Sequence, residues 1–251
     1  MQLNIQNEVY TEDYSSLDNS SKYLSPIIID FLKRNPEIKG NIVDIGCGKG
    51  GLLRKIKKAF NDRFNYFGID YYFEPIENEK KEIIYIKKDI NADFSEIEEK
   101  FDVAISTEVI EHVVDTDAFI TNIKKLLKPN GILIITTPNL AFFFNRILLI
   151  FGNQPIFTEI SWKQSFLGSL FIKKLFNAAG QGKNLNEAIF GHLRVFTFRA
   201  LEDFVKYHGF SIIKKKGTTI FTSTILRMIS RIFTLFPRMM PTIVIIAKKE
   251  E

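Results

Sequence analysis

The feature that most constrains the fold is a regular alternation of short apolar runs with amphipathic stretches along the first half of the chain. Apolar runs of strand length, rich in β-branched and aromatic residues, occupy 41–46, 64–70, 82–89, 101–107 and 131–137. Apolar residues at helical spacing predict helices at 24–38, 50–60, 93–100 and 116–128. Strands that alternate with helices favour a parallel sheet joined by right-handed crossovers, so we expect an α/β fold.

Turn-forming residues indicate where the predicted helices begin and end. Ser25 followed by Pro26 is a start signal, and Asn35 followed by Pro36 is a stop signal. The first helix should therefore lie between these two signals. Later in the chain, Gly209 is expected to end a helix as its C-terminal cap.

The pattern changes after Pro138. The next 50 or so residues are rich in aromatic side chains and lack the strand–helix spacing. The spacing then returns with an expected helix and two expected strands, at 197–209, 210–217 and 242–249. We expect one domain, 1–251, that adds three segments to the core sheet: an N-terminal helical cap 1–38, an insertion 139–192 and an apolar-basic connection 218–241.

Composition excludes several classes of protein. The single cysteine, Cys47, excludes an internal disulfide framework and favours a reducing compartment, so we expect a cytoplasmic protein. The formal net charge of +5 is modest and its lysines are scattered, so we expect no nucleic-acid partner. Neither long apolar stretch is typical of a membrane span, because 140–152 is short and 218–241 carries Arg227 and Arg231 near its middle.

A glycine-rich loop, "VDIGCGKGG", joins the first strand to the next helix. Its glycines fit G-x-G-x-G, and through Gly51 they also fit the dinucleotide pattern G-x-G-x-x-G. Asp44 lies just before the loop and would repel a pyrophosphate but attract an ammonium or a sulfonium. Asp70 ends the second strand, where a carboxylate can accept both ribose hydroxyls of either NAD or an adenosyl ligand.

Five motifs in order, "VDIGCGKGG", "GIDYY", "KKDIN", "FDVAISTEVIEHV" and "LLKPNGILIITTPN", resemble the class I S-adenosylmethionine-dependent methyltransferases. The resemblance is strong over 40–140 and weaker over 191–210. It implies a Rossmann-like three-layer sandwich around a seven-stranded, mostly parallel sheet. The implied strand order is 3-2-1-4-5-7-6, with the last strand antiparallel.

The resemblance implies S-adenosyl-L-methionine as the cofactor and S-adenosyl-L-homocysteine as its product. Asp44 is expected to support the amino group, Asp70 the ribose hydroxyls, and Asp89 the adenine edge. Asp44 and Asp89 have a plainer alternative, which is to cap turns, and Cys47 is a small loop filler rather than a nucleophile. The residues expected to border the cofactor are Asp44, Gly46, Cys47, Gly48, Asp70, Tyr71, Asp89, Ile90, Ser106, Thr107 and Glu108.

The run Glu108-x-x-Glu111-His112 has two interpretations. On a helix these three side chains would share a face and could hold a divalent ion, and the run resembles the metal-binding motif of ubiquinone-type and small-RNA 2′-O-methyltransferases. Similar runs also occur in the superfamily without metal, where they make local hydrogen bonds. We therefore assign no metal ligand and name His112 and His192 as the candidate catalytic residues, with His208 as structural.

The methyl acceptor is not encoded in a motif. Specificity should come from 139–192, from 218–241 and from an N-terminal segment in which Tyr10 and Tyr14 close over the cofactor. The apolar stretches either pack on each other or on a second copy of the chain, or they form an acceptor pocket or a membrane-surface face.

We predict methyl transfer to a hydroxyl or an amine of a small or lipid-linked acceptor. The alternatives are an NAD-binding oxidoreductase, for which no Tyr-x-x-x-Lys pair is present near the fourth strand, and a non-catalytic protein that binds S-adenosylmethionine.

Overall fold

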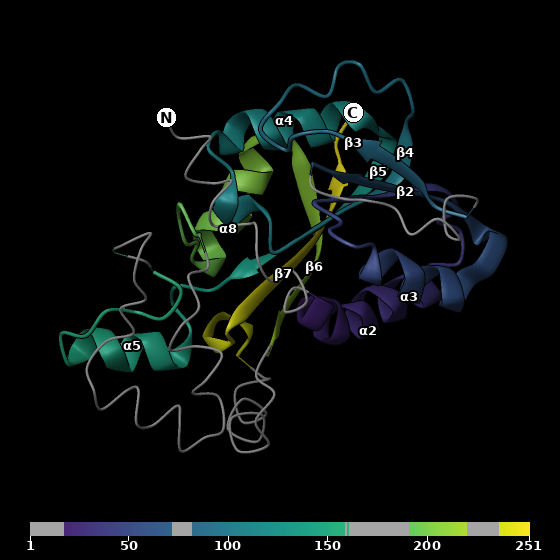
Figure 1. Cartoon of the computed structure of the whole chain (residues 1–251). Helices are drawn as coiled ribbons and strands as arrows, with labels where there is room; N and C mark the ends of the chain where they lie inside the picture. The colour runs from purple at the N-terminus through teal and green to yellow at the C-terminus, as the bar shows by residue number, and fades with distance from the viewer. Residues whose placement is uncertain (1–17, 72–81, 159, 161–190, 220–235) are drawn as a thin grey trace.

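The computed structural model describes residues 18–71, 82–158, 160, 191–219 and 236–251. Its centre is a seven-stranded sheet in the order β3-β2-β1-β4-β5-β7-β6, which confirms the expected topology (Figure 1). Strands β1 to β5 pair in parallel, while β7 pairs antiparallel with both β5 and β6. The strands are β1 (Gly40–Ile45), β2 (Phe64–Asp70), β3 (Ile84–Lys87), β4 (Phe101–Thr107), β5 (Leu127–Pro138), β6 (Phe210–Thr218) and β7 (Thr242–Lys249).

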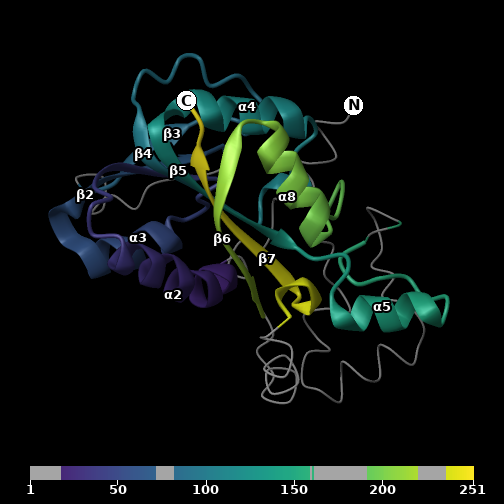
Figure 2. The ribbon, with the colours of Figure 1, turned by 180° about the vertical axis from the view of Figure 1, so that it is seen from behind.

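Helices cover both faces of the sheet. Figures 1 and 2 show α2 (Asp18–Arg34) and α3 (Gly51–Phe60) on one face, and α4 (Thr116–Leu126) and α8 (Phe198–Tyr207) on the other. Helix α5 (Phe143–Ile150) lies apart from both layers, beyond the end of β5. Three short 3-10 turns complete the described elements: η2 (Asn61–Arg63), η4 (Ile110–His112) and η5 (Pro237–Met239).

Alternate residues of the central strands pack into two separate hydrophobic cores. In β1, Val43 and Ile45 join the core under α4 and α8, whereas Ile42 joins the core under α2 and α3. In β7, Ile245 and Val244 divide in the same way. Because both faces are buried, the strands appear in the sequence as nearly continuous apolar runs. This burial explains why the strands could be recognised in the sequence as apolar runs.

The first helix begins earlier than predicted. Its expected start at Ser25 is wrong, because α2 begins at Asp18 and Pro26 lies inside it. A proline inside a helix costs about 3 kcal/mol. Leu24 and Leu32 are completely buried, and each such side chain contributes about 1.5–3 kcal/mol, which offsets that cost.

The short helix predicted at 93–100 is also wrong. This segment forms turns, with the Ile97 amide donating to the Phe94 carbonyl at 3.0 Å and both side chains buried. The Asp93 carboxylate accepts from the Ser95 amide at 3.2 Å. Such a local hydrogen bond offers the backbone an alternative to a helix.

Several predicted features lie outside the described residues. They include Tyr10 and Tyr14 of the N-terminal cap, most of the insertion 139–192, and 220–235 of the apolar-basic connection. Among the helices that the structure describes, none is both long and apolar enough to cross a bilayer.

The carboxyl ends of the parallel strands meet at one edge of the sheet. Strands β1, β2, β4 and β5 end there, so the loops that follow them are neighbours in space. In open α/β sheets ligands bind at this edge. Most of the predicted site residues end or follow the parallel strands, and the fold therefore gathers them at this edge.

Candidate active site

The glycine loop makes the turn between β1 and α3. Gly46 has φ +74°, and a Cβ there would lie 2.5 Å from a methyl group of Val109, so only glycine fits. Gly48 has φ +50°, and a Cβ there would have nothing within 4 Å among the described residues. The loop therefore packs tightly on its Gly46 side and exposes backbone to open space at Gly48.

Two carboxylates flank this loop. Asp70 Oδ2 accepts a hydrogen bond from the Gly48 amide at 2.8 Å, which fixes the loop to the end of β2. Asp44 is 2% exposed, and its Oδ1 has no hydrogen-bond partner among the described residues. Burial, and then the charge of Asp70, raise the pKa of Asp44 well above its ordinary value. A buried carboxyl that lacks a partner needs a donor, and a ligand ammonium group would supply one.

The sulfur of Cys47 fits the role of a loop filler. The side chain is buried, and burial raises the pKa of the thiol well above its ordinary value. A reactive cysteine requires the opposite shift. The sulfur lies close to Gly68 of β2, where a Cβ would be 2.7 Å from it. The Cys47 side chain therefore packs between the loop and β2.

The residues expected near adenine lie after β2 and β3. Tyr71 is 48% exposed, with the Lys87 ammonium 5.7 Å from its ring centre. Asp89 Oδ1 accepts from both the backbone and the side-chain amide of Asn91, so this carboxylate does cap a turn. Ile90 packs against the core. Asp89 thus already has the structural role that was its plainer alternative.

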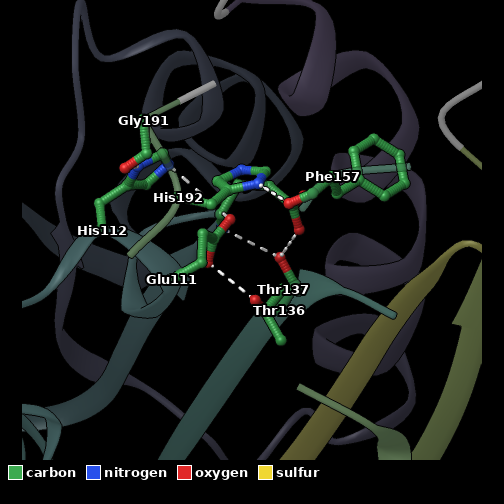
Figure 3. A network of polar contacts seen from close by, with 8 residues as sticks. Glu111, His112, Thr136, Thr137, Phe157, Gly191 and His192 are labelled. Carbon is green, nitrogen blue, oxygen red and sulfur yellow. Dashed lines mark hydrogen bonds and ion pairs between the residues drawn. The ribbon is translucent and has the colours of Figure 1, made fainter. Parts of the chain in front are cut away.

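A second group of side chains gathers beyond β4 and β5 (Figure 3). Glu111 is 1% exposed, and its Oε2 accepts a hydrogen bond from Thr137 Oγ1 at 2.8 Å. Its Oε1 lies 3.9 Å from His112 Nε2. The ring of His192 lies 5.0 Å from that of His112, centre to centre. We call Glu111, His112 and His192 the polar triad.

Backbone carbonyls orient both imidazoles of the triad. His112 Nδ1 is 3.1 Å from the Gly191 oxygen, and His192 Nδ1 is 2.8 Å from the Phe157 oxygen (Figure 3). A carbonyl only accepts, so Nδ1 carries the proton on each ring and Nε2 carries the lone pair. Burial lowers the pKa of His112 to about 4 and that of His192 to about 3. Both rings are therefore neutral at pH 7.

Glu108 lies between the loop and the triad. Its backbone has φ +56°, and its amide donates to the Thr136 carbonyl at 3.1 Å. The Thr136 hydroxyl donates to Glu108 Oε1 at 2.7 Å. Burial raises the pKa of Glu108 to about 7. Burial and then the charge of Glu108 raise the pKa of Glu111 well above its ordinary value.

The Glu108–His112 run does not form the helix on which the metal interpretation of the sequence depended. The run instead forms the short turn η4, and Glu108 precedes it in a left-handed conformation. His112 contacts Gly191, distant in sequence, rather than its neighbours on a helix. Consequently the tightest cluster pairs Glu111 and His112 with His192 instead of Glu108.

The triad fits a divalent ion. One donor atom from each residue lies within 4.8 Å of the others. Three atoms that share one ion at about 2.0–2.2 Å lie about 3.3–3.8 Å apart, so the widest pair of the triad would close by about 1 Å. Thr137, Gly191 and Phe157 supply the outer hydrogen bonds that orient such ligands. The sequence led us to assign no metal ligand, and the structure supplies a set that suits one.

Three contributors to this site carry no sequence signal that we used. Thr136 and Thr137 end β5 within the recognised "LLKPNGILIITTPN" motif, so attention to hydroxyls at that edge would have found them. Phe157 contributes a backbone carbonyl, which no side-chain pattern reveals. Ser106 and Thr107 are the last two residues of β4; Ser106 is fully buried and Thr107 is partly exposed.

This sheet order, with a glycine loop after β1 and an acidic residue ending β2, defines the Rossmann-like class of S-adenosylmethionine-dependent methyltransferases, which confirms the predicted class. The chain belongs to the methyltransferase domain family, whose sequence profile matches residues 18–215.

Relatives and solved structures agree with this assignment. A ubiquinone biosynthesis O-methyltransferase of Actinobacillus pleuropneumoniae is 33% identical over 129 residues, covering 46% of this chain and 54% of the relative. The enzyme of the same name from Rickettsia conorii is 40% identical over 123 residues, covering 45% and 40%. The chain thus spans about half the length of the curated relatives it matches. An S-adenosylmethionine-dependent methyltransferase of Clostridium acetobutylicum shares the fold, with TM-score 0.58 at 14% identity over 100% of both chains.

Proposed function

We propose that the protein transfers the methyl group of S-adenosylmethionine to a hydroxyl of a small, lipid-linked acceptor. The observation that carries this proposal is the position of the polar triad, on the same sheet edge as the glycine loop and Asp44. The relatives named for ubiquinone biosynthesis support O-methylation and an acceptor with an apolar tail.

On the cofactor side, we assign Asp44 to the ammonium group of the methionine portion and Asp70 to the ribose hydroxyls. The sulfonium methyl would then be directed toward Ser106 and Glu108 at the end of β4. The methyl donor is already activated, so displacement by an oxygen in line with the sulfur–carbon bond needs mainly positioning and exclusion of water. The remaining cofactor residues are proposed as the sequence predicts them: Gly46, Cys47, Gly48, Tyr71, Asp89, Ile90 and Thr107.

On the acceptor side, the triad would hold a divalent ion through Glu111, His112 and His192. When bound, such an ion lowers the pKa of an acceptor hydroxyl. The neutral imidazoles suit this role, because a protonated ring cannot bind a metal. The chain itself orients the three donors, through the Thr137 hydroxyl and the two backbone carbonyls. The proposed catalytic roles of His112 and His192 are therefore to bind and orient.

The cofactor is tested by thermal unfolding with S-adenosylhomocysteine or NAD. A ligand at 100 times its dissociation constant stabilises the native state by about 2.7 kcal/mol, and we expect this only for S-adenosylhomocysteine. Methyl transfer is tested with radiolabelled S-adenosylmethionine and a phenol that carries an isoprenoid tail, with and without a chelator. Stabilisation by NAD alone would contradict the proposal, and transfer to an amine but not to a hydroxyl would overturn its acceptor class.

We also propose that α5 contacts the membrane surface that holds such an acceptor. Leu149, Ile150 and Phe151 are 55%, 79% and 75% exposed at its C-terminal end. Arg146 is exposed three and four positions before the first two, on the same side of the helix, where a cation meets anionic headgroups. The alternative occupant of this surface is a second copy of the chain.

Cosedimentation with anionic vesicles at low salt tests the membrane contact. We expect the protein to pellet with the vesicles, and the triple change of Leu149, Ile150 and Phe151 to serine to leave it in the supernatant. Sedimentation velocity without lipid provides the control for self-association. A dimer that the same triple change dissociates, together with no binding to vesicles, would assign the surface to a homodimer instead.

A further inference from the structure

Two residues of the site have an unusual backbone conformation. Four described non-glycine residues have positive φ: Asn61, Glu108, Asn130 and Phe157. Asparagine tolerates this conformation, but glutamate and phenylalanine rarely adopt it. Phe157 contacts the polar triad through His192, and Glu108 bonds to Thr136, next to the threonine that supports Glu111. Strained backbone of this kind persists only where the surrounding structure enforces it.

Phe157, with φ +73°, is held from both sides. Its ring is 3% exposed and lies 6.2 Å from the ring of Phe142 and 6.2 Å from that of His192. The preceding residue, Ile156, is fixed by the side chain of Asn145. Asn145 Oδ1 accepts from the Ile156 amide at 2.8 Å, and Asn145 Nδ2 donates to the Ile156 carbonyl at 3.2 Å.

Asn145, which holds Ile156 in place, belongs to α5. Asn145 is completely buried, and its Nδ2 also donates to the Leu140 carbonyl at 2.9 Å. A buried amide with all these hydrogen bonds is costly to disturb. The side chain therefore ties the start of α5 to the segment that precedes Phe157.

The enforced conformation has a chemical consequence at His192. The Phe157 carbonyl accepts from His192 Nδ1 at 2.8 Å (Figure 3). A hydrogen bond from one ring nitrogen to a carbonyl decides which nitrogen carries the proton. With Nδ1 protonated, Nε2 is the nitrogen whose lone pair serves the triad.

We infer that Phe157 is a positioning residue for His192. Asn145 and the left-handed backbone at Phe157 together aim one carbonyl at His192 Nδ1, and so select the imidazole tautomer. The inference rests on the proposed function, because the orientation of His192 matters only if His192 belongs to the active site. If Phe157 has this role, the segment from α5 to Phe157 is a structural part of the site and does not merely lie over it.

Histidine tautomers can be measured directly in the resting protein. The chain has three histidines, so a long-range ¹H–¹⁵N correlation spectrum of histidine-labelled protein can be assigned with His112→Gln and His208→Gln. At pH 7 we expect His192 to be protonated on Nδ1. His112 serves as an internal control, because its carbonyl partner is Gly191, and His208 reports folding through its bond to Phe204.

A matched pair of variants separates backbone conformation from ring packing. Phe157→Gly and Phe157→Ala both remove the ring, but only glycine adopts positive φ without strain. We expect Phe157→Gly to keep the Nδ1–H tautomer, and Phe157→Ala to shift the tautomer ratio of His192 at least fivefold toward Nε2–H. Asn145→Leu should cause a similar shift if it folds. In each case the signals of His112 should stay unchanged.

Two results would overturn the inference. One is an unchanged His192 tautomer in Phe157→Ala, and the other is an equal change in the alanine and glycine variants. No cofactor or acceptor is present in these spectra, so a failure of methyl transfer would contradict the proposed function and leave the tautomer result intact.

Discussion

The proposed cofactor side and the proposed acceptor side of the site are built in different ways. The centre of the proposed cofactor side is one continuous loop, whose Gly48 amide is bound by Asp70 at the end of the neighbouring strand. The acceptor side brings together η4, the end of β5, the segment after α5 and His192. The glycine loop is encoded by a short stretch of sequence, whereas the polar triad forms only when distant segments of the fold come together. The two sides should therefore respond differently to substitution.

The largest expected effect is on the acceptor side. Glu111→Gln removes the carboxyl group of the triad, which can ionise to bind a metal, but keeps its shape and its contact with Thr137. Changes to residues that only support a metal ligand cost about 10–100-fold, so we expect the ligand itself to cost more than about 100-fold in methyl transfer. S-adenosylhomocysteine affinity, measured by calorimetry, should stay within twofold. An equal loss of both would mean that the two sides are not separate.

Gly46→Ala should affect both sides at once, because Gly46 contacts Val109 next to Glu108. A Cβ there clashes with the valine, which costs about 1–3 kcal/mol, and positive φ adds about 1–2 kcal/mol. We expect the free energy of unfolding in urea to fall by about 2–5 kcal/mol. In the background of Val109→Ala, the same change should cost only the part due to φ. If the losses of unfolding free energy caused by Gly46→Ala and by Val109→Ala simply add in the double variant, the Gly46–Val109 contact does not couple the two sides.

Asp44→Asn should weaken the cofactor side alone. A hydrogen bond to a charged group contributes about 1.5–3 kcal/mol, so we expect the affinity for S-adenosylhomocysteine to fall by about 10–150-fold. Because the pKa of Asp44 is raised by burial, the free protein at neutral pH already resists its negative charge. Its stability without ligand should therefore not decrease. A stable variant with unchanged affinity would remove Asp44 from the cofactor site.

Thr137→Val should weaken the acceptor side by a smaller amount. The change keeps the shape of the side chain but removes the hydroxyl that orients Glu111 Oε2 at 2.8 Å. Loss of such an outer hydrogen bond costs about 10–100-fold in metal affinity or activity. Thr137→Ser restores the hydroxyl and is the matched control. Affinity for manganese should likewise be lower in Thr137→Val than in Thr137→Ser. Equal manganese affinities in the two variants would exclude a positioning role for the hydroxyl.

The same contrast explains what could be predicted from the sequence. The limits of β2 and β4 were predicted correctly, and Asp70 was placed correctly at the end of β2, because apolar runs and their turn residues are local signals. The start of α2 was missed because tertiary packing outweighed Pro26. His192 was named singly, but its relation to Glu111 and to Phe157 requires knowing which distant loops meet at one edge.

One further consequence concerns the order in which the chain is made. The ladder partners of Thr136 and Thr137 are Val244 and Ile243, in a strand that is synthesised last among those described. At about 5–20 residues per second, these partners leave the ribosome on the order of ten seconds after the threonines. During synthesis the part of the sheet that carries the glycine loop is therefore made first, and β5 acquires β7 as its neighbour only late. A nascent chain stalled before β7 is expected to bind S-adenosylhomocysteine but not to transfer methyl groups.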